Sequence, residues 1–234
     1  MGILNHFSVN AMLSIKKIVL VLGSLCLAGG AQAQFGVTVG PNYTQFAITT
    51  RSQFQTVDPV GKVGYQVGAF YEHKVADRVS LVPEVQFRYQ RTNLDLDDFK
   101  EGYQSAYQVR RSYVSVPLAL RVYLGQVYLD FGSQVGALLD AREEGTTRSL
   151  FESLPDPTAV RSFNQSARDS YQRFDLASFA SLGLQLPAGF GGAVRLTNSW
   201  GDVNRGNQPN RYTGSLGSVT IQTSLSYRLT AGHN

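Results

Sequence analysis

Cysteine is almost absent from this chain, and no long hydrophobic run occurs beyond its N-terminal part. The only cysteine, Cys26, lies in an apolar run that we expect to be removed. The mature chain then has no thiol, which excludes disulfides, thiolate catalysis and cysteine-ligated metals. Nothing after residue 33 resembles a membrane-spanning helix, which needs about 20 predominantly apolar residues in a row. The informative patterns are therefore shorter ones.

The first 33 residues are typical of a secretory signal peptide. Lys16-Lys17 is the basic region, Ile18 to Ala28 is the apolar region, and Ala31-Gln32-Ala33 is a small-x-small cleavage pattern. We expect cleavage after Ala33, which leaves residues 34–234 as a single domain. Eleven residues precede Met12, which is long for a basic region, so translation starts either at the first residue or at Met12.

Positive and negative charges are nearly balanced once the leader is removed. The leader holds two lysines and no acidic residue, which leaves 19 basic against 17 acidic residues. The basic residues are scattered along the chain, and an exported protein does not meet nucleic acid. We therefore expect no nucleic-acid partner.

Residues 79–90 show the pattern around which the rest of the chain is organised. Apolar residues occupy the odd positions and polar residues the even ones, except for Val82. A period of two predicts a β-strand with one apolar and one polar face. The polar face includes the charged residues Glu84 and Arg88. A membrane β-barrel turns its apolar face to lipid and its polar face inward, so we expect odd positions such as Val85 to face lipid.

Seven further segments alternate in the same way. They are 35–46, 63–72, 113–123, 127–139, 173–186, 190–200 and 219–229. The connections at 75–78, 125–126 and 187–189 are short, whereas those at about 48–62, 92–111, 141–171 and 201–217 are long and polar. Short periplasmic turns and long extracellular loops are typical of outer-membrane barrels. The sequence therefore predicts an all-β fold, an eight-stranded antiparallel up-and-down transmembrane β-barrel in the outer membrane.

Charged residues fall on the inward faces of six predicted strands. They are Glu84, Arg88, Arg121, Asp130, Asp175, Arg195 and Arg228. The interior of an eight-stranded barrel is just wide enough for side chains to fill. An unpaired buried charge is costly, so we expect these residues to form a network of mutually paired charges. A narrow ion pore is the alternative.

Two of the predicted extracellular loops carry the residues best suited to bind a partner. These candidates are Asp95, Asp97, Asp98, Arg142, Arg148 and Phe151. The spacing of the aspartates lacks the glycine and the terminal glutamate of an EF-hand, so we expect no metal site. Catalysis at this rim would use a histidine, but His73 lies beside a periplasmic turn and His233 lies in the tail. We therefore expect no enzymatic activity and no cofactor.

Several short motifs are shared with a known family. They are Gly64-Tyr65-Gln66-Val67-Gly68, Arg78 to Glu84, Tyr113 to Leu118, Phe174-Asp175 and Tyr227-Arg228-Leu229. Through these motifs the chain resembles the PorT-like eight-stranded outer-membrane β-barrel family of Gram-negative bacteria, over nearly the whole mature chain. The resemblance implies an outer-membrane location and assembly by the barrel insertion machinery. Some members of that family take part in protein secretion or gliding.

The expected function is that of a barrel without catalytic activity, with a structural or adhesive role or as an accessory of an envelope complex for secretion or motility. The expected partners are outer-membrane lipid, lipopolysaccharide, the insertion machinery and an envelope protein. Basic side chains near the outer rim suit lipopolysaccharide phosphates. The alternative is a soluble periplasmic barrel that holds a small apolar ligand. That fold requires the apolar faces to point inward.

Overall fold

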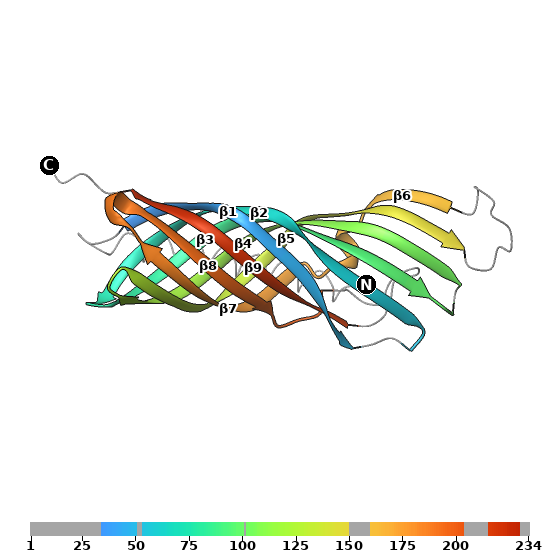
Figure 1. Ribbon diagram of the computed structural model, residues 1–234, viewed down its shortest axis with the longest axis horizontal. Helices are drawn as coiled ribbons and strands as arrows, with labels where there is room; N and C mark the ends of the chain where they lie inside the picture. Colours follow the sequence, from blue (N-terminus) through green and yellow to red (C-terminus); the bar gives the residue numbers. More distant parts are fainter. Residues whose placement is uncertain (1–33, 51–52, 101, 150–159, 204–214, 230–234) are drawn as a thin grey trace, which may run out of the picture.

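The computed structural model describes residues 34–50, 53–100, 102–149, 160–203 and 215–229 (Figure 1). The expected leader and Phe151 lie outside these ranges. The elements are β1 (Gln34–Thr50), β2 (Gln55–Ala76), β3 (Val79–Asp98), β4 (Tyr103–Leu124), β5 (Val127–Ser149), β6 (Val160–Ser166), η2 (Arg168–Ser170), β7 (Phe174–Gln185), η3 (Pro187–Gly189), β8 (Phe190–Ser199) and β9 (Ser215–Leu229). In this part of the chain, no helix is long and apolar enough to cross a membrane.

Eight of the strands form a closed antiparallel ring, which confirms the predicted fold. The ring runs β1-β2-β3-β4-β5-β7-β8-β9, and β9 pairs with β1 to close it. Closure gives every strand two hydrogen-bonded neighbours, which lipid demands because it offers no partners to backbone groups. The tight turn after β4 has Gly125 at φ +74°, a conformation that glycine adopts without strain.

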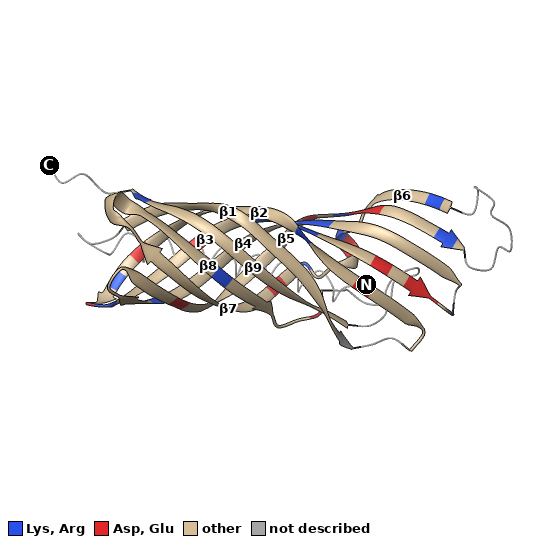
Figure 2. Cartoon of the chain, in the orientation of Figure 1, with Lys and Arg blue, Asp and Glu red and all other residues tan. Residues whose placement is uncertain are grey.

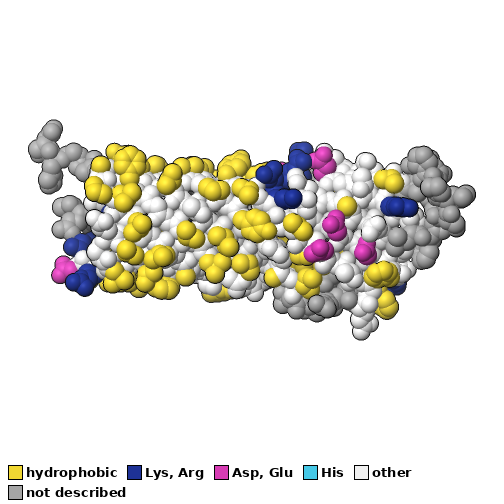
Figure 3. Space-filling view, in the orientation of Figure 1, with side chains coloured by type: hydrophobic (Ala, Val, Ile, Leu, Met, Phe, Trp, Pro, Cys, Tyr) yellow, Lys and Arg dark blue, Asp and Glu magenta, His cyan; other side chains and the backbone are white. Residues whose placement is uncertain are grey.

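The side chains of β3 point in the predicted directions, with odd positions outward and even positions inward. Val85 is 57% exposed, whereas Glu84, Gln86 and Arg88 are buried inside the ring. Apolar side chains from all around the ring cover the outside of the cylinder over much of its length (Figure 3). This arrangement is the reverse of what a soluble barrel with an apolar ligand site requires, because here the apolar faces point outward.

Strands β2 to β5 extend far beyond this apolar belt, and here the predicted loop boundaries are wrong. The residues predicted as loops at 48–62, 92–111 and 141–149 are largely strand, and these four strands are 20 to 23 residues long. The alternation continues through Asn93 to Asp97, but the apolar residues now face inward: Leu94 and Leu96 are buried, and Asn93, Asp95 and Asp97 point outward. Beyond the membrane the outer wall meets water, so polar residues belong on it and apolar residues belong inside.

We call the part of the barrel beyond the apolar belt the extension. Its interior is a hydrophobic core drawn from most of the strands and from the segment between β6 and β7. The core comprises Phe46, Val57, Leu94, Leu96, Tyr103, Val109, Tyr113, Leu138, Ala141, Ala167, Tyr171, Val203 and Leu216. Strand β6 lies only in the extension, where it pairs with the outer end of β5 (Figure 1). The barrel therefore has a mainly polar interior within the apolar belt, and its larger hydrophobic core lies above the belt.

Two register shifts lie near the boundary between the belt and the extension. One falls on β2 between Lys62 and Tyr65, and the other lies on β5 opposite Ser112 and Tyr113. A bulge inserts one extra residue into a strand, so the inward positions change from even to odd or from odd to even. On β5, for example, Leu138 and Ala141 both point inward. These shifts interrupt the simple alternation at the place where the sequence predicts that the strands end.

Candidate functional site: the luminal charge groups and the outer cavity

A bidentate ion pair lies near the periplasmic end of the lumen. Arg121 on β4 and Asp130 on β5 are register partners, so their side chains emerge side by side. Arg121 Nε lies 2.7 Å from Asp130 Oδ1, and Nη2 lies 3.0 Å from Oδ2. Ser181 donates a further hydrogen bond to the same carboxylate at 2.9 Å. Both charged side chains are buried, so the pair is held by protein groups and not by bulk water.

Glu72 joins this pair to Arg228. Its carboxylate accepts hydrogen bonds from Arg228 Nη2 at 2.6 Å, from Arg121 Nη1 at 3.3 Å and from the Tyr123 hydroxyl at 2.6 Å. Glu72 and Tyr123 are absent from the predicted set of luminal charges. The alternation of the second segment places Glu72 on the polar face, and that signal alone was sufficient to include it.

A second group lies near the middle of the barrel. Arg195 Nη2 on β8 lies 3.0 Å from Glu84 Oε2 on β3, and its guanidinium lies 4.5 Å from the centre of the Phe179 ring. Thr38 and Gln86 donate hydrogen bonds to the same carboxylate. The free volume between the first and second groups is a cavity of about 30 Å³. That space is enough for only about one or two water molecules.

The third group lies at the outer end of the polar lumen. Arg88 is 1% exposed, and its Nη2 lies 3.8 Å from Asp175 Oδ2. In the orientation that satisfies both side chains, the amide oxygen of Gln134 accepts two hydrogen bonds from Arg88, at 3.0 and 3.3 Å. All seven residues of the predicted luminal set thus lie beside an opposite charge, in three separate groups stacked along the barrel axis.

The candidate binding residues of the predicted loops lie on strands. Asp95 and Asp97 point outward from β3, and Arg142 and Arg148 point outward from β5. Asp98 is 3% exposed and accepts hydrogen bonds from Gln55 and from the backbone of the following turn, so it stabilises the end of β3. The wrong placement has one physical cause, which is the reversed alternation above the membrane. That any of these residues binds a partner stays a prediction.

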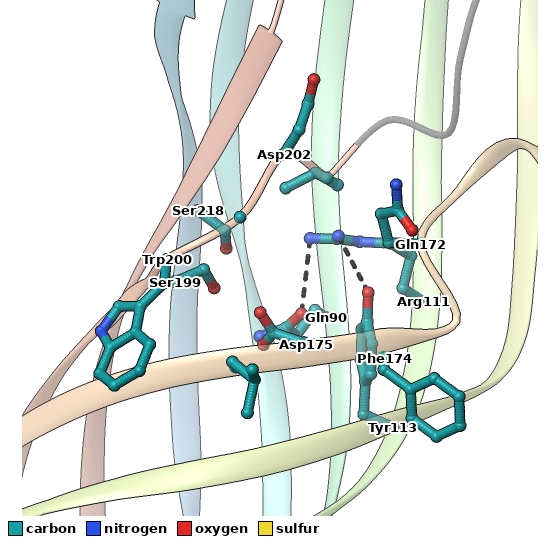
Figure 4. Close-up of a pocket in the computed structure, with 13 residues that line it drawn as sticks. Gln90, Arg111, Tyr113, Gln172, Phe174, Asp175, Ser199, Trp200, Asp202 and Ser218 are labelled. Carbon is teal, nitrogen blue, oxygen red and sulfur yellow. Dashed lines mark hydrogen bonds between the residues drawn. The ribbon is translucent and has the colours of Figure 1, made fainter. Parts of the chain in front are cut away.

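A cavity of about 380 Å³ opens above the third group, beside residues 199–203 at the end of β8. Figure 4 shows the Arg111 guanidinium pointing into it, with Trp200 and Phe174 at its margin. Arg111 is 3% exposed and donates to the Tyr113 hydroxyl and to Gln90, at 3.1 and 3.5 Å. No carboxylate of the described residues forms an ion pair with it; aromatic rings surround it, including Phe46 at 4.5 Å. Arg111 lies in a predicted loop, so no pattern in the sequence marked it as inward-facing.

We expect the stability of the extension to depend on alkaline pH through Tyr171. Its hydroxyl donates to Glu143 at 2.7 Å, and both residues are buried. Burial and the nearby Glu143 carboxylate raise the pKa of Tyr171 well above its ordinary value of 10. The unfolded chain therefore loses this proton first, so the stabilisation is complete below about pH 10 and falls as pH rises further.

We expect Tyr171→Phe to weaken this alkaline dependence of the stability. Tyrosinate absorbance of the folded protein measures the titration, and a fully ordinary titration of every tyrosine would contradict it.

No curated protein sequence matches this chain. Among solved structures, the attachment invasion locus protein Ail of Yersinia pestis, in complex with the heparin analogue sucrose octasulfate, is 12% identical over 85% of this chain and 100% of that chain, with a TM-score of 0.45. The outer membrane protein OprG of Pseudomonas aeruginosa is 11% identical over 87% of this chain and 99% of that chain, with a TM-score of 0.44. The family model described as outer membrane protein beta-barrel domain matches residues 30–204. The chain therefore belongs to the outer membrane protein β-barrel domain family, and it is an outer-membrane barrel protein.

Proposed function

We propose that this protein is a non-catalytic and non-conducting outer-membrane barrel that presents its extension at the cell surface. Its role there is structural or adhesive, or it serves as an accessory of an envelope complex. The observation that carries the proposal is the closed interior. Charged groups fill the lumen within the belt, and an apolar core fills the extension above it.

Two different barriers lie in series along the barrel axis. Within the belt, Arg195 and Arg88 extend across the lumen to a carboxylate on a distant strand, and Arg121 pairs with Asp130 on the neighbouring strand. In the extension, the hydrophobic core fills the interior together with buried polar side chains such as Arg111 and Glu143. An ion would have to break buried pairs within the belt and then pass this packed core. The arrangement therefore favours a plug over the narrow ion pore that the sequence left open.

Planar-bilayer recording tests this proposal. We expect the purified wild-type protein to show no discrete, reproducible conductance steps, because the luminal charges are paired and the free space between them is small. Heat-modifiable migration in a gel, measured on the same preparation, ensures that the recorded protein is folded. Reproducible small steps from the folded protein would support a pore and contradict the plug.

The absence of catalysis is supported by where the mature histidines lie. His73 is on the outer surface at the periplasmic end of β2, where its ring stacks on Tyr71 at 6.4 Å. It therefore lies at the opposite end of the barrel from the Arg111 cavity and the extension. His233 lies outside the described residues. No cluster of three or more metal-ligating side chains occurs within the described ranges.

The finer assignment to a PorT-like barrel is also part of this proposal. Two of its motifs lie at register shifts: Gly64 to Gly68 begins within the shift on β2, and Tyr113 to Leu118 begins beside the shift on β5. Export through a cleaved signal and assembly by the insertion machinery belong with it. N-terminal sequencing of the mature protein is expected to begin at Gln34.

Co-purification in mild detergent separates the accessory role from that of a free-standing surface barrel. We expect an envelope protein to remain bound if the role is accessory, and the contact to involve the outward faces of the extension. An adhesive role instead predicts that the protein is isolated alone and that intact cells lose attachment when the extension is removed by protease. Isolation alone without any effect on attachment would leave only a structural role.

A further inference from the structure

We propose that Lys62, Arg91, Arg110 and Arg142 form a binding site for the phosphate groups of the outer-leaflet glycolipid. The sequence predicted lipopolysaccharide as a partner without naming residues. The site rests on the proposed orientation, in which the extension projects from the outer surface. We call these four residues the cationic row.

The four residues are direct neighbours across four strands. Lys62 on β2 pairs with Arg91 on β3, Arg91 pairs with Arg110 on β4, and Arg110 pairs with Arg142 on β5. At an inter-strand spacing of about 4.8 Å, the row is about 14 Å long. Like charges directly opposite one another destabilise a strand pair. A row of four is therefore an unfavourable arrangement unless an anion lies against it.

The cationic row lies where the outer wall changes from apolar to polar. On β3 the outward residues before Arg91 are Phe87 and Tyr89, and those after it are Asn93 and Asp95. Figure 3 shows basic side chains at the edge of the apolar surface, and Figure 2 shows acidic residues farther out on the same strands. The polar headgroups of a bilayer lie just outside its hydrocarbon core. Phosphates of the outer leaflet and the cationic row are thus at the same height.

The register shift on β2 fixes the position of one member of the cationic row, Arg91. Val63 lies within the shift and has no partner residue on β3. Its carbonyl oxygen accepts hydrogen bonds from Arg91 Nε and Nη2, at 2.9 and 2.6 Å. The guanidinium is therefore held toward β2 at the boundary, and Arg91 is the register partner of Lys62. A guanidinium in a fixed position is well suited to charge-assisted hydrogen bonds with phosphate oxygens.

Acidic side chains neutralise only half of the row. Arg110 is paired with Glu144, and Arg142 Nε lies 3.6 Å from Asp140. Within the described residues, neither Lys62 nor Arg91 has a carboxylate within ion-pair distance. These two residues are therefore the part of the row with unused charge, and they are the ones to change.

The test compares two double variants that remove the same charge. Lys62→Gln with Arg91→Gln changes the row, whereas Arg161→Gln with Arg168→Gln changes exposed cations of β6 and η2 in the extension. The probe is purified bisphosphorylated lipid A, and binding to the folded protein in detergent is measured by native mass spectrometry. We expect the row variant to bind about 10- to 30-fold more weakly than wild type and the control variant to bind like wild type.

Two further ligands identify the chemistry. Dephosphorylated lipid A is expected to bind wild type as weakly as bisphosphorylated lipid A binds the row variant. Equal binding of the two lipids, or an equal loss in both double variants, would overturn the site. Displacement of the lipid by low concentrations of inorganic phosphate would assign the site to a free anion instead and would also overturn the proposal. A conducting barrel that still prefers the phosphorylated lipid would contradict the proposed function but not this site.

Discussion

Val85→Arg is expected to destabilise the barrel in a bilayer, lowering its free energy of unfolding by about 2–4 kcal/mol. Val85 lies on the outward face of β3 between Pro83 and Phe87, and it is 57% exposed on a surface that we place against lipid. A guanidinium there loses its water without gaining a partner. Urea titration of the protein refolded in lipid vesicles measures the change.

Two further substitutions test which side chains of the barrel wall face lipid, which face water and which face the lumen. Ala106→Arg introduces the same side chain on the outward face of β4 in the extension, where water solvates it, and is expected to change stability by less than about 0.5 kcal/mol. Gln86→Ala removes buried hydrogen bonds to Glu84 and Gln222 and is expected to cost about 1 kcal/mol. Equal tolerance of arginine at positions 85 and 106 would mean that the apolar belt does not contact lipid.

Arg121→Met is expected to destabilise the barrel by about 3–5 kcal/mol, because it leaves a buried carboxylate without its cation. Asp130 is 1% exposed and would keep only the hydrogen bond from Ser181. Glu72 would suffer less, since Arg228 and Tyr123 still contact it. The methionine fills much of the volume of the arginine stem, so the loss reports mainly on charge.

The double variant Arg121→Met with Asp130→Leu separates charge from packing. Removing both partners of a buried ion pair is often close to neutral, so we expect it to recover most of the stability lost in the single variant. The same vesicle titration gives the coupling energy from the four proteins of the cycle. A single variant that costs less than about 1 kcal/mol would mean that water reaches Asp130 and that the plug is open.

Much of the fold could be predicted because the period of two appears directly in the sequence. The segment 79–90 shows which residues face lipid, and the short turns show which end is periplasmic. The extension was missed because the same period continues there with apolar and polar faces exchanged, as Leu94, Asp95 and Leu96 show. A search for lipid-facing residues stops where the outside becomes water, although the strand does not.

The partners within the lumen could not be predicted in the same way. The sequence placed Glu84 and Arg88 on one face of one strand, yet Glu84 pairs with Arg195, and Arg88 lies beside Asp175. Which charges meet depends on the register of each strand pair and on how side chains cross a narrow ring. Neither quantity is contained in the alternation of a single segment.

By itself, the sequence determined the strand period, the lipid-facing residues and most of the inward charges within the belt, since these depend on neighbours along one strand. Only the tertiary structure decided how the strands continue above the membrane and how residues far apart in sequence meet. Lys62, Arg91, Arg110 and Arg142 are separate residues in the sequence and become one row through the register of four strands. The physical reason is that hydrogen bonding between strands sets register, and register depends on all the paired strands together.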